Sequence, residues 1–448
     1  MAVLILITFF VFCVGALVQP RWALALLLLM YPLEQAIQGS VSFFIDQQSL
    51  VNYIVGIVVV LSATQGWLRG KLNTHGYLNP IWLAFISAYV YSFISLLWTP
   101  SQAKSWSLIS EGYQYVVMYI IIAPLLVDDV KDWNRVLFIT LIFGLASAIA
   151  ILTSPSFTLE SGRLGFNFTS KIRSSPLAIG ELGGFLMLTS SLLVPGHRHF
   201  WMLAIRVLAL LCGVVLSIFS GSRGQFFFAV ILLIIFFPLS RPIKNLAQFF
   251  MICFGSIALL LLVALIGSFL IGDVDVSNRW LSADKSNEAV GVRLANAFEL
   301  LNAFMRSPSS WLQGLGHNAF TSFSGSQEPY SHIMFIDVLA EMGIVATIIL
   351  IACLYKIIAI SIELLQYTNS NPQLRSAAVV LVALCAYQLL LMNKQGELWS
   401  SQNTVVYFIL LAKVFWSTRA EMNNNEPLHE LEPTPIDPVS ENKHTSLV

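Results

Sequence analysis

Residues 201–240 read WMLAIRVLALLCGVVLSIFSGSRGQFFFAVILLIIFFPLS, two apolar runs joined by the short polar turn SGSRG. Each run is close to the roughly 17–25 apolar residues that a helix needs to cross the hydrocarbon core of a bilayer. Similar apolar runs, separated by polar connections, cover most of the 448-residue chain. The stretch therefore predicts two membrane helices joined by a tight turn, within a chain that crosses the membrane many times.

The composition supports the same interpretation, because 57% of the residues are hydrophobic and only 11% are charged. Soluble domains carry about 25% charged residues. We therefore expect the lipid bilayer to be the environment of most of the chain. The formal net charge is zero, which gives no reason to expect a nucleic-acid partner. The five cysteines lie in apolar runs without CxxC spacing, so we expect no disulfide, metal ion or cofactor.

The predicted fold class is all-α, a polytopic membrane bundle of about twelve or thirteen transmembrane helices with one long helical loop. The candidate spans are residues 2–18, 22–38, 50–68, 80–98, 108–127, 135–153, 176–195, 201–220, 224–240, 247–272, 333–362, 376–393 and 402–417. Inside the long loop, 273–332, a helix is predicted over 287–306 with Ser286 or Asn287 as its cap. The apolar face of that helix is expected to contain Val292, Ala295, Leu300 and Phe304.

Basic residues in the short connections predict the orientation, because cytoplasmic loops carry an excess of lysine and arginine. Those in alternate connections are Arg69, Lys71, Lys131, Arg135, Arg198, Arg241, Lys244 and Arg375. The membrane domain would then cover 1–417, and the polar, proline-rich segment 418–448 would be a disordered cytoplasmic tail. Residues 154–175, 221–223 and 273–332 fall on the opposite side. The cations in the short 154–175 connection oppose the usual bias and indicate an anionic ligand.

Two groups of cations are candidates for binding such an anion. Arg223 in the SGSRG turn either extends its guanidinium to the membrane surface or offers a planar fork to phosphate, with glycines allowing close approach. Arg163, Lys171 and Arg173, interspersed with phenylalanines, either bind pyrophosphate and stack on sugars or form an ordinary basic loop. Glu181, at the start of the next span, would pair with one of these cations.

Two histidines are candidates for a general base, because histidine exchanges a proton near neutral pH. His332 lies where the long loop meets the next span, and His317 competes for the same role. Asp337 and Glu341, four residues apart, share a predicted helix face in an apolar run. Carboxylates are costly there and are functional candidates by default. Either would orient the histidine or hold an arginine.

SGSRG followed by an apolar span, then Arg293, WLQGLGHNAF (311–320) and SHIMFIDVLAEMGI (331–344), resembles the family of O-antigen polymerases and O-antigen ligases. The resemblance covers the whole topology loosely and residues 215–350 more closely. It implies an inverting, metal-independent glycosyltransferase of the bacterial inner membrane. Its donor would be a glycan on undecaprenyl pyrophosphate, bound at the periplasmic face.

Carried over from the resemblance, Arg223 and Arg293 would hold the pyrophosphate and His332 would activate the acceptor hydroxyl. Members of the family often have His-Asn at that junction. Here His332 is followed by Ile333, and the His-Asn pair occurs at 317–318, so both histidines remain candidates for the base.

The resemblance leaves the acceptor open. A polymerase would extend another lipid-linked repeat unit, whereas a ligase would transfer the glycan to lipid A–core or to a protein. Arg173 and Gly184 fit an Arg-x10-Gly spacing of polymerases, and a polymerase would have a chain-length regulator as a candidate partner. The rival is a transporter or flippase for a lipid-linked glycan, which should have symmetric halves and broken helices with charges near the bilayer midplane. A structural scaffold would leave the extracytoplasmic arginines unexplained.

Overall fold

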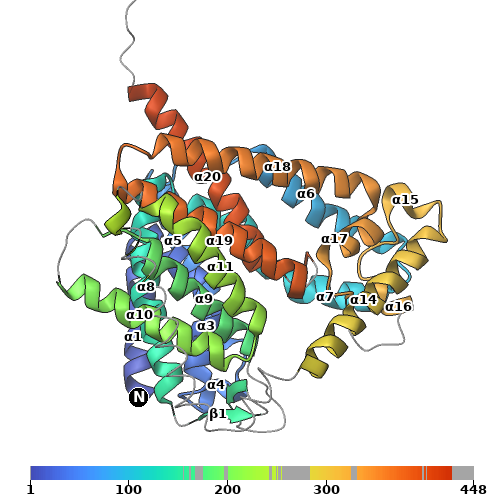
Figure 1. The fold of residues 1–448 in the computed structure, drawn as a ribbon. Helices are drawn as coiled ribbons and strands as arrows, with labels where there is room; N and C mark the ends of the chain where they lie inside the picture. Colours follow the sequence, from blue (N-terminus) through green and yellow to red (C-terminus); the bar gives the residue numbers. More distant parts are fainter. Residues whose placement is uncertain are drawn as a thin grey trace, which may run out of the picture.

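The computed structural model describes residues 2–154, 156–160, 163–166, 175–195, 200–241, 245–248, 250, 254, 283–323, 330–395, 398–399 and 401–425. Over these residues the chain is an all-α helix bundle with one two-stranded hairpin (Figure 1). Within this part, eight helices are long and apolar enough to cross a bilayer. The predicted fold class is confirmed, and the chain is a multi-pass membrane protein. The predicted span 247–272 lies almost wholly outside the described residues.

The first third of the chain contributes helices to two parts of the molecule. Its elements are α1 (Ala2–Val18), α2 (Pro20–Leu28), α3 (Met30–Gln38), α4 (Phe43–Asp46), α5 (Leu50–Leu68), α6 (Pro80–Ile94), the 3₁₀ turn η1 (Ser95–Leu97), α7 (Gln102–Tyr115), the π-helix η2 (Val116–Ile122), the 3₁₀ turn η3 (Ala123–Leu125) and α8 (Val130–Thr153). A short hairpin, β1 (Phe157–Glu160) and antiparallel β2 (Arg163–Phe166), follows at the end of the bundle where α1 begins (Figure 1).

The later elements complete the bundle, and several of them form a smaller group of helices beside it together with α6 and α7 (Figure 1). They are α9 (Pro176–Leu192), α10 (Phe200–Phe219), α11 (Arg223–Ser240), α14 (Ala283–Met305), α15 (Ser310–Gln313), α16 (Phe320–Phe323), α17 (Met334–Asp337), the π-helix η4 (Val338–Met342), α18 (Gly343–Tyr367), α19 (Pro372–Gln395) and α20 (Gln402–Asn425). The predicted loop helix is present as α14.

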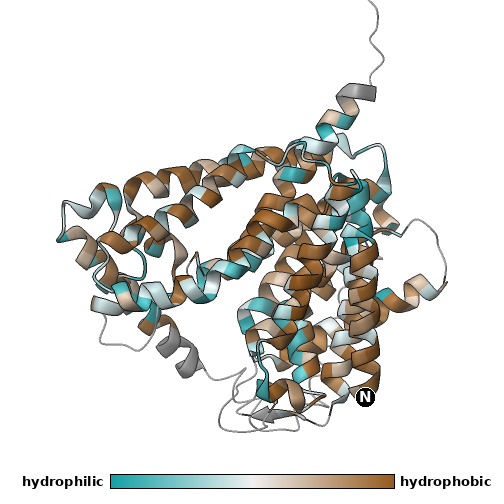
Figure 2. Cartoon of the chain, turned by 180° about the vertical axis from the view of Figure 1, so that it is seen from behind, coloured by the Kyte–Doolittle hydropathy of each residue, from teal (hydrophilic) through white to brown (hydrophobic). Residues whose placement is uncertain are grey.

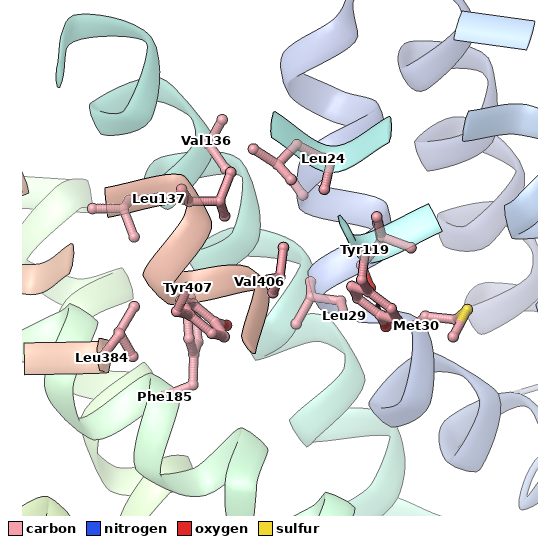
Figure 3. Close-up of a cluster of buried hydrophobic side chains, with 14 of the residues drawn as sticks. Leu24, Leu29, Met30, Tyr119, Val136, Leu137, Phe185, Leu384, Val406 and Tyr407 are labelled. Carbon is pink, nitrogen blue, oxygen red and sulfur yellow. Dashed lines mark hydrogen bonds between the residues drawn. The ribbon is translucent and has the colours of Figure 1, made fainter. Parts of the chain in front are cut away.

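Helix α20 passes through the interior of the bundle. Its run Val405–Ala412 is apolar on every side, and such a helix is stable only when it is enclosed. Figure 3 shows Val406 and Tyr407 packed among side chains of α2, α8 and α9. The outer helices instead have exposed isoleucine, leucine and phenylalanine side chains. Figure 2 shows that hydrophobic residues cover most of the length of these helices. Lipid is the solvent that makes such a surface stable.

Three predicted spans are interrupted by a change of helix geometry, and a fourth, 80–98, ends in the 3₁₀ turn η1. The predicted span 22–38 consists of α2 and α3, because Pro32 lacks an N–H and its ring obstructs the carbonyl of Leu28. The span predicted at 108–127 changes to π and 3₁₀ geometry before Pro124. The carbonyl oxygens of Ile120 and Ile121 there accept from Trp82 Nε1 (2.8 Å) and the Tyr77 hydroxyl (2.9 Å). The third, 333–362, is interrupted by η4. Each break frees backbone groups that need partners inside the bundle.

At the opposite end from the hairpin, several predicted cytoplasmic connections meet around Lys413 of α20. The ammonium group is fully buried and donates to the carbonyls of Asn73 (3.0 Å) and His75 (2.6 Å). It also lies 2.9 Å from Ser417 Oγ and 3.5 Å from the carboxylate of Asp128. These contacts bring together the loops after α5 and before α8.

The same end of the molecule extends α20 beyond residue 418, where the disordered tail was predicted to begin. The helix continues to Asn425. Lys131 pairs with Glu421 at 2.6 Å, and Arg419 lies 4.0 Å from Glu363 of α18. These ion pairs keep the polar end of α20 helical, although the composition of this segment favours disorder. Residues 426–448 of the predicted tail lie outside the described part of the chain.

We expect Lys413→Met to lower the free energy of unfolding by about 2 kcal/mol, because two buried carbonyls lose a charged donor and Asp128 loses its counter-ion. Thermal unfolding in detergent micelles measures the change. Lys131→Met is the control, because its ion pair with Glu421 is largely exposed and should contribute less than about 1 kcal/mol. Equal effects of the two substitutions would show that burial of Lys413 does not contribute.

Candidate functional site

The GLGHNAF segment forms a rigid loop. The carboxylate of Glu341 accepts from the backbone N–H groups of Asn318 (3.0 Å) and Phe320 (3.3 Å). Gly316 has φ +96°, and a Cβ there would lie 2.7 Å from the Cα of Thr99, so only glycine fits without strain. Glu341 was predicted to orient a histidine or hold an arginine. It orients the backbone on the C-terminal side of His317 by accepting these N–H groups.

His317 is packed into this loop. Its backbone N–H donates to Ser95 Oγ (2.9 Å). Its backbone carbonyl accepts from the hydroxyls of Thr99 and Ser105, both at 2.7 Å. The ring is 4% exposed and meets Trp399 edge-on, with the ring centres 5.8 Å apart. Burial lowers the pKa of His317 to about 4, so the ring is neutral at physiological pH. This histidine is a poor acceptor for a substrate proton.

The buried neutral ring predicts an acid-sensitive fold. As the pH falls from 6.5 to about 4, the unfolded chain binds a proton at His317 while the folded protein does not. The stability contributed by the neutral ring is complete above pH 6.5 and is lost in this window, by up to about 3 kcal/mol. We expect His317→Phe to weaken the dependence of the melting temperature on pH between 7 and 5. An identical dependence in both proteins would contradict the assignment.

His332 has a different environment. It is half-buried, has a φ of +69° that is unusual for a residue with a side chain, and its ring meets Tyr330 edge-on at 4.5 Å. The carboxylate of Asp337 accepts from the N–H of Ser331 at 3.3 Å and fixes the residue that precedes the histidine. Strained backbone of this kind is concentrated at functional sites. Through this contact Asp337 supports the backbone segment that leads into His332.

Asp337 and Glu341 do not share one face of a regular α-helix. Asp337 ends α17, and Glu341 lies in the π-helix η4, which separates the two carboxylates in direction. The shared face was expected because residues four apart lie on one side of an α-helix. In the wider π turn, residues four apart no longer lie on one side. The two residues instead stabilise two different segments, one around His332 and one around His317.

A cavity of about 350 Å³ lies between α3, the start of α9, the end of α19 and the start of α20. Its lining residues are Tyr31, Glu34, Gln35, Ser175, Leu177, Ala178, Glu181, Tyr330, Leu391, Met392, Ser401, Asn403 and Thr404. A smaller cavity of about 30 Å³ adjoins it and shares Tyr31, Ala178, Glu181 and Asn403. The volume of the larger one is in the range of small-molecule sites. Tyr330 contributes to the wall, and its ring meets the ring of His332 edge-on with the centres 4.5 Å apart.

The SGSRG turn adjoins the same cavity. Gly221 has φ +63°, α11 begins at Arg223, and Gln225 Nε2 donates to the carbonyl of Leu177 at 2.8 Å. Lys394, at the end of α19, donates from Nζ to Ser222 Oγ at 3.1 Å. The turn therefore combines two cations with the N-terminus of a helix, an arrangement that favours an anion.

Lys394 was missed at the level of sequence. It directly follows the predicted span 376–393 and was not among the candidate site residues. A usable signal was present, because this connection falls on the predicted extracytoplasmic side, where basic residues are disfavoured.

Two carboxylates also line the cavity. Glu181 accepts from Gln388 Nε2 at 2.6 Å. Two of the cations with which it was predicted to pair, Lys171 and Arg173, lie outside the described residues. Glu34 of α3 accepts from Gln38 (3.1 Å) and Asn52 (3.3 Å). The sequence did not single out Glu34 because residues from distant helices surround it.

Arg293 lies on α14, which contacts α17 and η4. The buried face of α14 consists of Asn296, Ala297, Leu300 and Phe304. Arg293 is half-buried and continues this face by one turn. Val292 and Ala295 were predicted on the apolar face and are exposed, because α14 packs on the side that carries Ala297. The helix also begins at Ala283, earlier than the predicted cap at Ser286 or Asn287.

The remaining predicted cations lie near the hairpin. Arg163 begins β2 and is exposed, and the hairpin is anchored because the Phe157 ring lies against Gly39, just after α3. Lys171 and Arg173 lie outside the described residues. A comparison with models of known protein families gave no match, and a comparison with curated proteins gave none.

Proposed function

We propose that this chain is a membrane-embedded glycosyltransferase that joins undecaprenyl-pyrophosphate-linked oligosaccharides at the periplasmic face of a bacterial inner membrane. One observation supports it most. A ligand-sized cavity is lined by Tyr330, whose ring contacts that of His332, and by Leu177, whose carbonyl is bound by Gln225 next to the turn with Arg223 and Lys394. A base and an anion site next to the same cavity are the two groups that glycosyl transfer from a pyrophosphate requires.

In the proposed reaction, His332 accepts the proton of an acceptor hydroxyl. The hydroxyl oxygen then forms a bond to the anomeric carbon of the donor sugar, and the bond from that carbon to the pyrophosphate oxygen breaks. Undecaprenyl pyrophosphate leaves with the electron pair, and Arg223 and Arg293 neutralise its charge without a metal ion. Attack opposite to the leaving group inverts the configuration at the anomeric carbon.

The preferred acceptor is a second lipid-linked repeat unit, which would make the enzyme a polymerase of O-antigen or exopolysaccharide. The alternative is a ligase that transfers the glycan to lipid A–core or to protein. Purified protein, incubated with the lipid-linked oligosaccharide with and without lipid A–core, separates these cases on a gel. A ladder from the lipid-linked substrate alone supports the polymerase, whereas product formed only with lipid A–core supports the ligase.

A transporter of lipid-linked glycans is the second candidate, and one observation favours it. The break between α2 and α3 and the carboxylates Glu34 and Glu181 within the bundle are features of transport proteins. Protein reconstituted into vesicles decides between the two. Movement of the labelled lipid-linked glycan between leaflets, without any new glycosidic bond, would replace the enzyme with the transporter.

A further inference from the structure

We propose that the 350 Å³ cavity is a sugar site, in which Glu34 and Glu181 bind hydroxyl groups of the glycan, and that the pyrophosphate stays outside it at the Arg223–Lys394 turn. This inference rests on the proposed glycosyltransferase function and assigns its substrate groups to separate places. It also assigns roles to two carboxylates that the transfer chemistry does not use.

The charge of the cavity is the first reason. Its ionisable lining residues include two carboxylates, and none of the residues that line it within the described chain is lysine, arginine or histidine. A pyrophosphate placed there would meet like charges in a poorly solvated space, where repulsion is strong. Lys394 lies instead at Ser222, in the turn that precedes Arg223, and this turn reaches the cavity wall through the hydrogen bond from Gln225 to the carbonyl of Leu177.

The positions of the carboxylates are the second reason. Glu181 is held by Gln388, whose own amide oxygen accepts from Thr404 Oγ1 at 3.1 Å. Glu34 is held by Gln38 and Asn52. Each carboxylate has about four acceptor positions, so these contacts leave capacity directed to the cavity. The hydroxyl groups of a sugar are uncharged hydrogen-bond donors, so they can fill these remaining acceptor positions.

The other lining groups suit a sugar better than a polyprenyl chain. Tyr31 offers an aromatic ring, on which the apolar face of a sugar packs. Asn403, Ser401 and Thr404 supply further donors and acceptors. A hydrocarbon chain would bury these polar groups without hydrogen bonds, which is unfavourable.

Ligand-induced thermal shifts in detergent test the assignment with two probes. One is the lipid-free oligosaccharide released by mild acid from the natural lipid-linked substrate, and the other is undecaprenyl pyrophosphate without sugar. We expect Glu34→Gln and Glu181→Gln each to weaken oligosaccharide binding about tenfold, the loss of one charge-assisted hydrogen bond. Both variants should bind undecaprenyl pyrophosphate as the wild type does. Arg223→Ala should show the converse pattern.

Glu363→Gln is the matched control. It removes a carboxylate of α18 that pairs with Arg419 of α20 and does not line the cavity. If either glutamine variant fails to fold, Asn403→Leu replaces it, with the same expected tenfold loss. Oligosaccharide binding that is unchanged in all three cavity variants would overturn the proposal, and so would loss of undecaprenyl pyrophosphate binding in the glutamate variants.

The outcome is separable from that of the proposed function. Carboxylate-dependent oligosaccharide binding by a protein that forms no product would keep the sugar site and reject the enzyme. Product formation with unchanged sugar binding and unchanged KM in Glu34→Gln and Glu181→Gln would keep the enzyme and reject the sugar site.

Discussion

Substitution of His332 is expected to lower the rate of glycan transfer by about 10²–10⁴-fold, the contribution of a positioned general base. His332→Asn is the most informative change, because asparagine accepts the positive φ of this position better than alanine does. The backbone is thus retained while the base is removed. The measurement is the initial rate of product formation on the gel, at equal amounts of folded protein.

His317→Phe is the control for the choice of histidine. The neutral, buried ring of His317 packs against Trp399, so its loss should change stability more than the rate measured per folded molecule. A His332→Asn protein that retains the wild-type rate, or a His317→Phe protein that folds normally and is inactive, would transfer the role of base to His317 or to another group.

Arg223→Ala is expected to lower transfer by about 10²–10³-fold, the usual effect of removing one donor that stabilises charge developing in a transition state. Arg223→Lys should recover part of the rate, because lysine restores the charge without the planar fork that binds phosphate through two bonds. Arg293→Ala should act in the same direction as Arg223→Ala.

Arg206→Ala is the control for Arg223. Arg206 is an arginine of the adjacent helix α10, and its guanidinium donates to the carbonyl of Ser190 at 2.7 Å near the other end of the bundle. Its loss should leave the rate within about twofold, the scale of small structural effects on a remote site. Comparable loss of activity in Arg206→Ala and Arg223→Ala would indicate a general effect of charge on folding, and the proposed pyrophosphate site would be abandoned.

Much of the fold was accessible from the sequence. The runs 201–220 and 224–240 correspond to α10 and α11, and the predicted loop helix corresponds to α14. Apolar length and helical period are properties of contiguous residues, so they are visible without tertiary contacts. The breaks at Leu29 and at η4 were less accessible, although Pro32 gave a local signal for the first.

The composition of the site was partly accessible in the same way. The motifs drew attention to His317, His332, Asp337 and Glu341, and the two carboxylates stabilise the two separate segments that carry these histidines. The sequence left open which histidine is suited to act as a base. Burial beside Trp399, which is far along the chain from His317, distinguishes the two.

That this protein spans a membrane with many helices follows from its amino-acid sequence, since each span needs only its own apolar residues and hydrogen bonds. The tertiary structure alone decided that Glu34, Glu181 and Tyr330 line one cavity and that Lys394 joins the turn before Arg223. These residues come from helices separated by long stretches of chain. Their proximity depends on how the helices pack, and no local pattern encodes packing between distant segments.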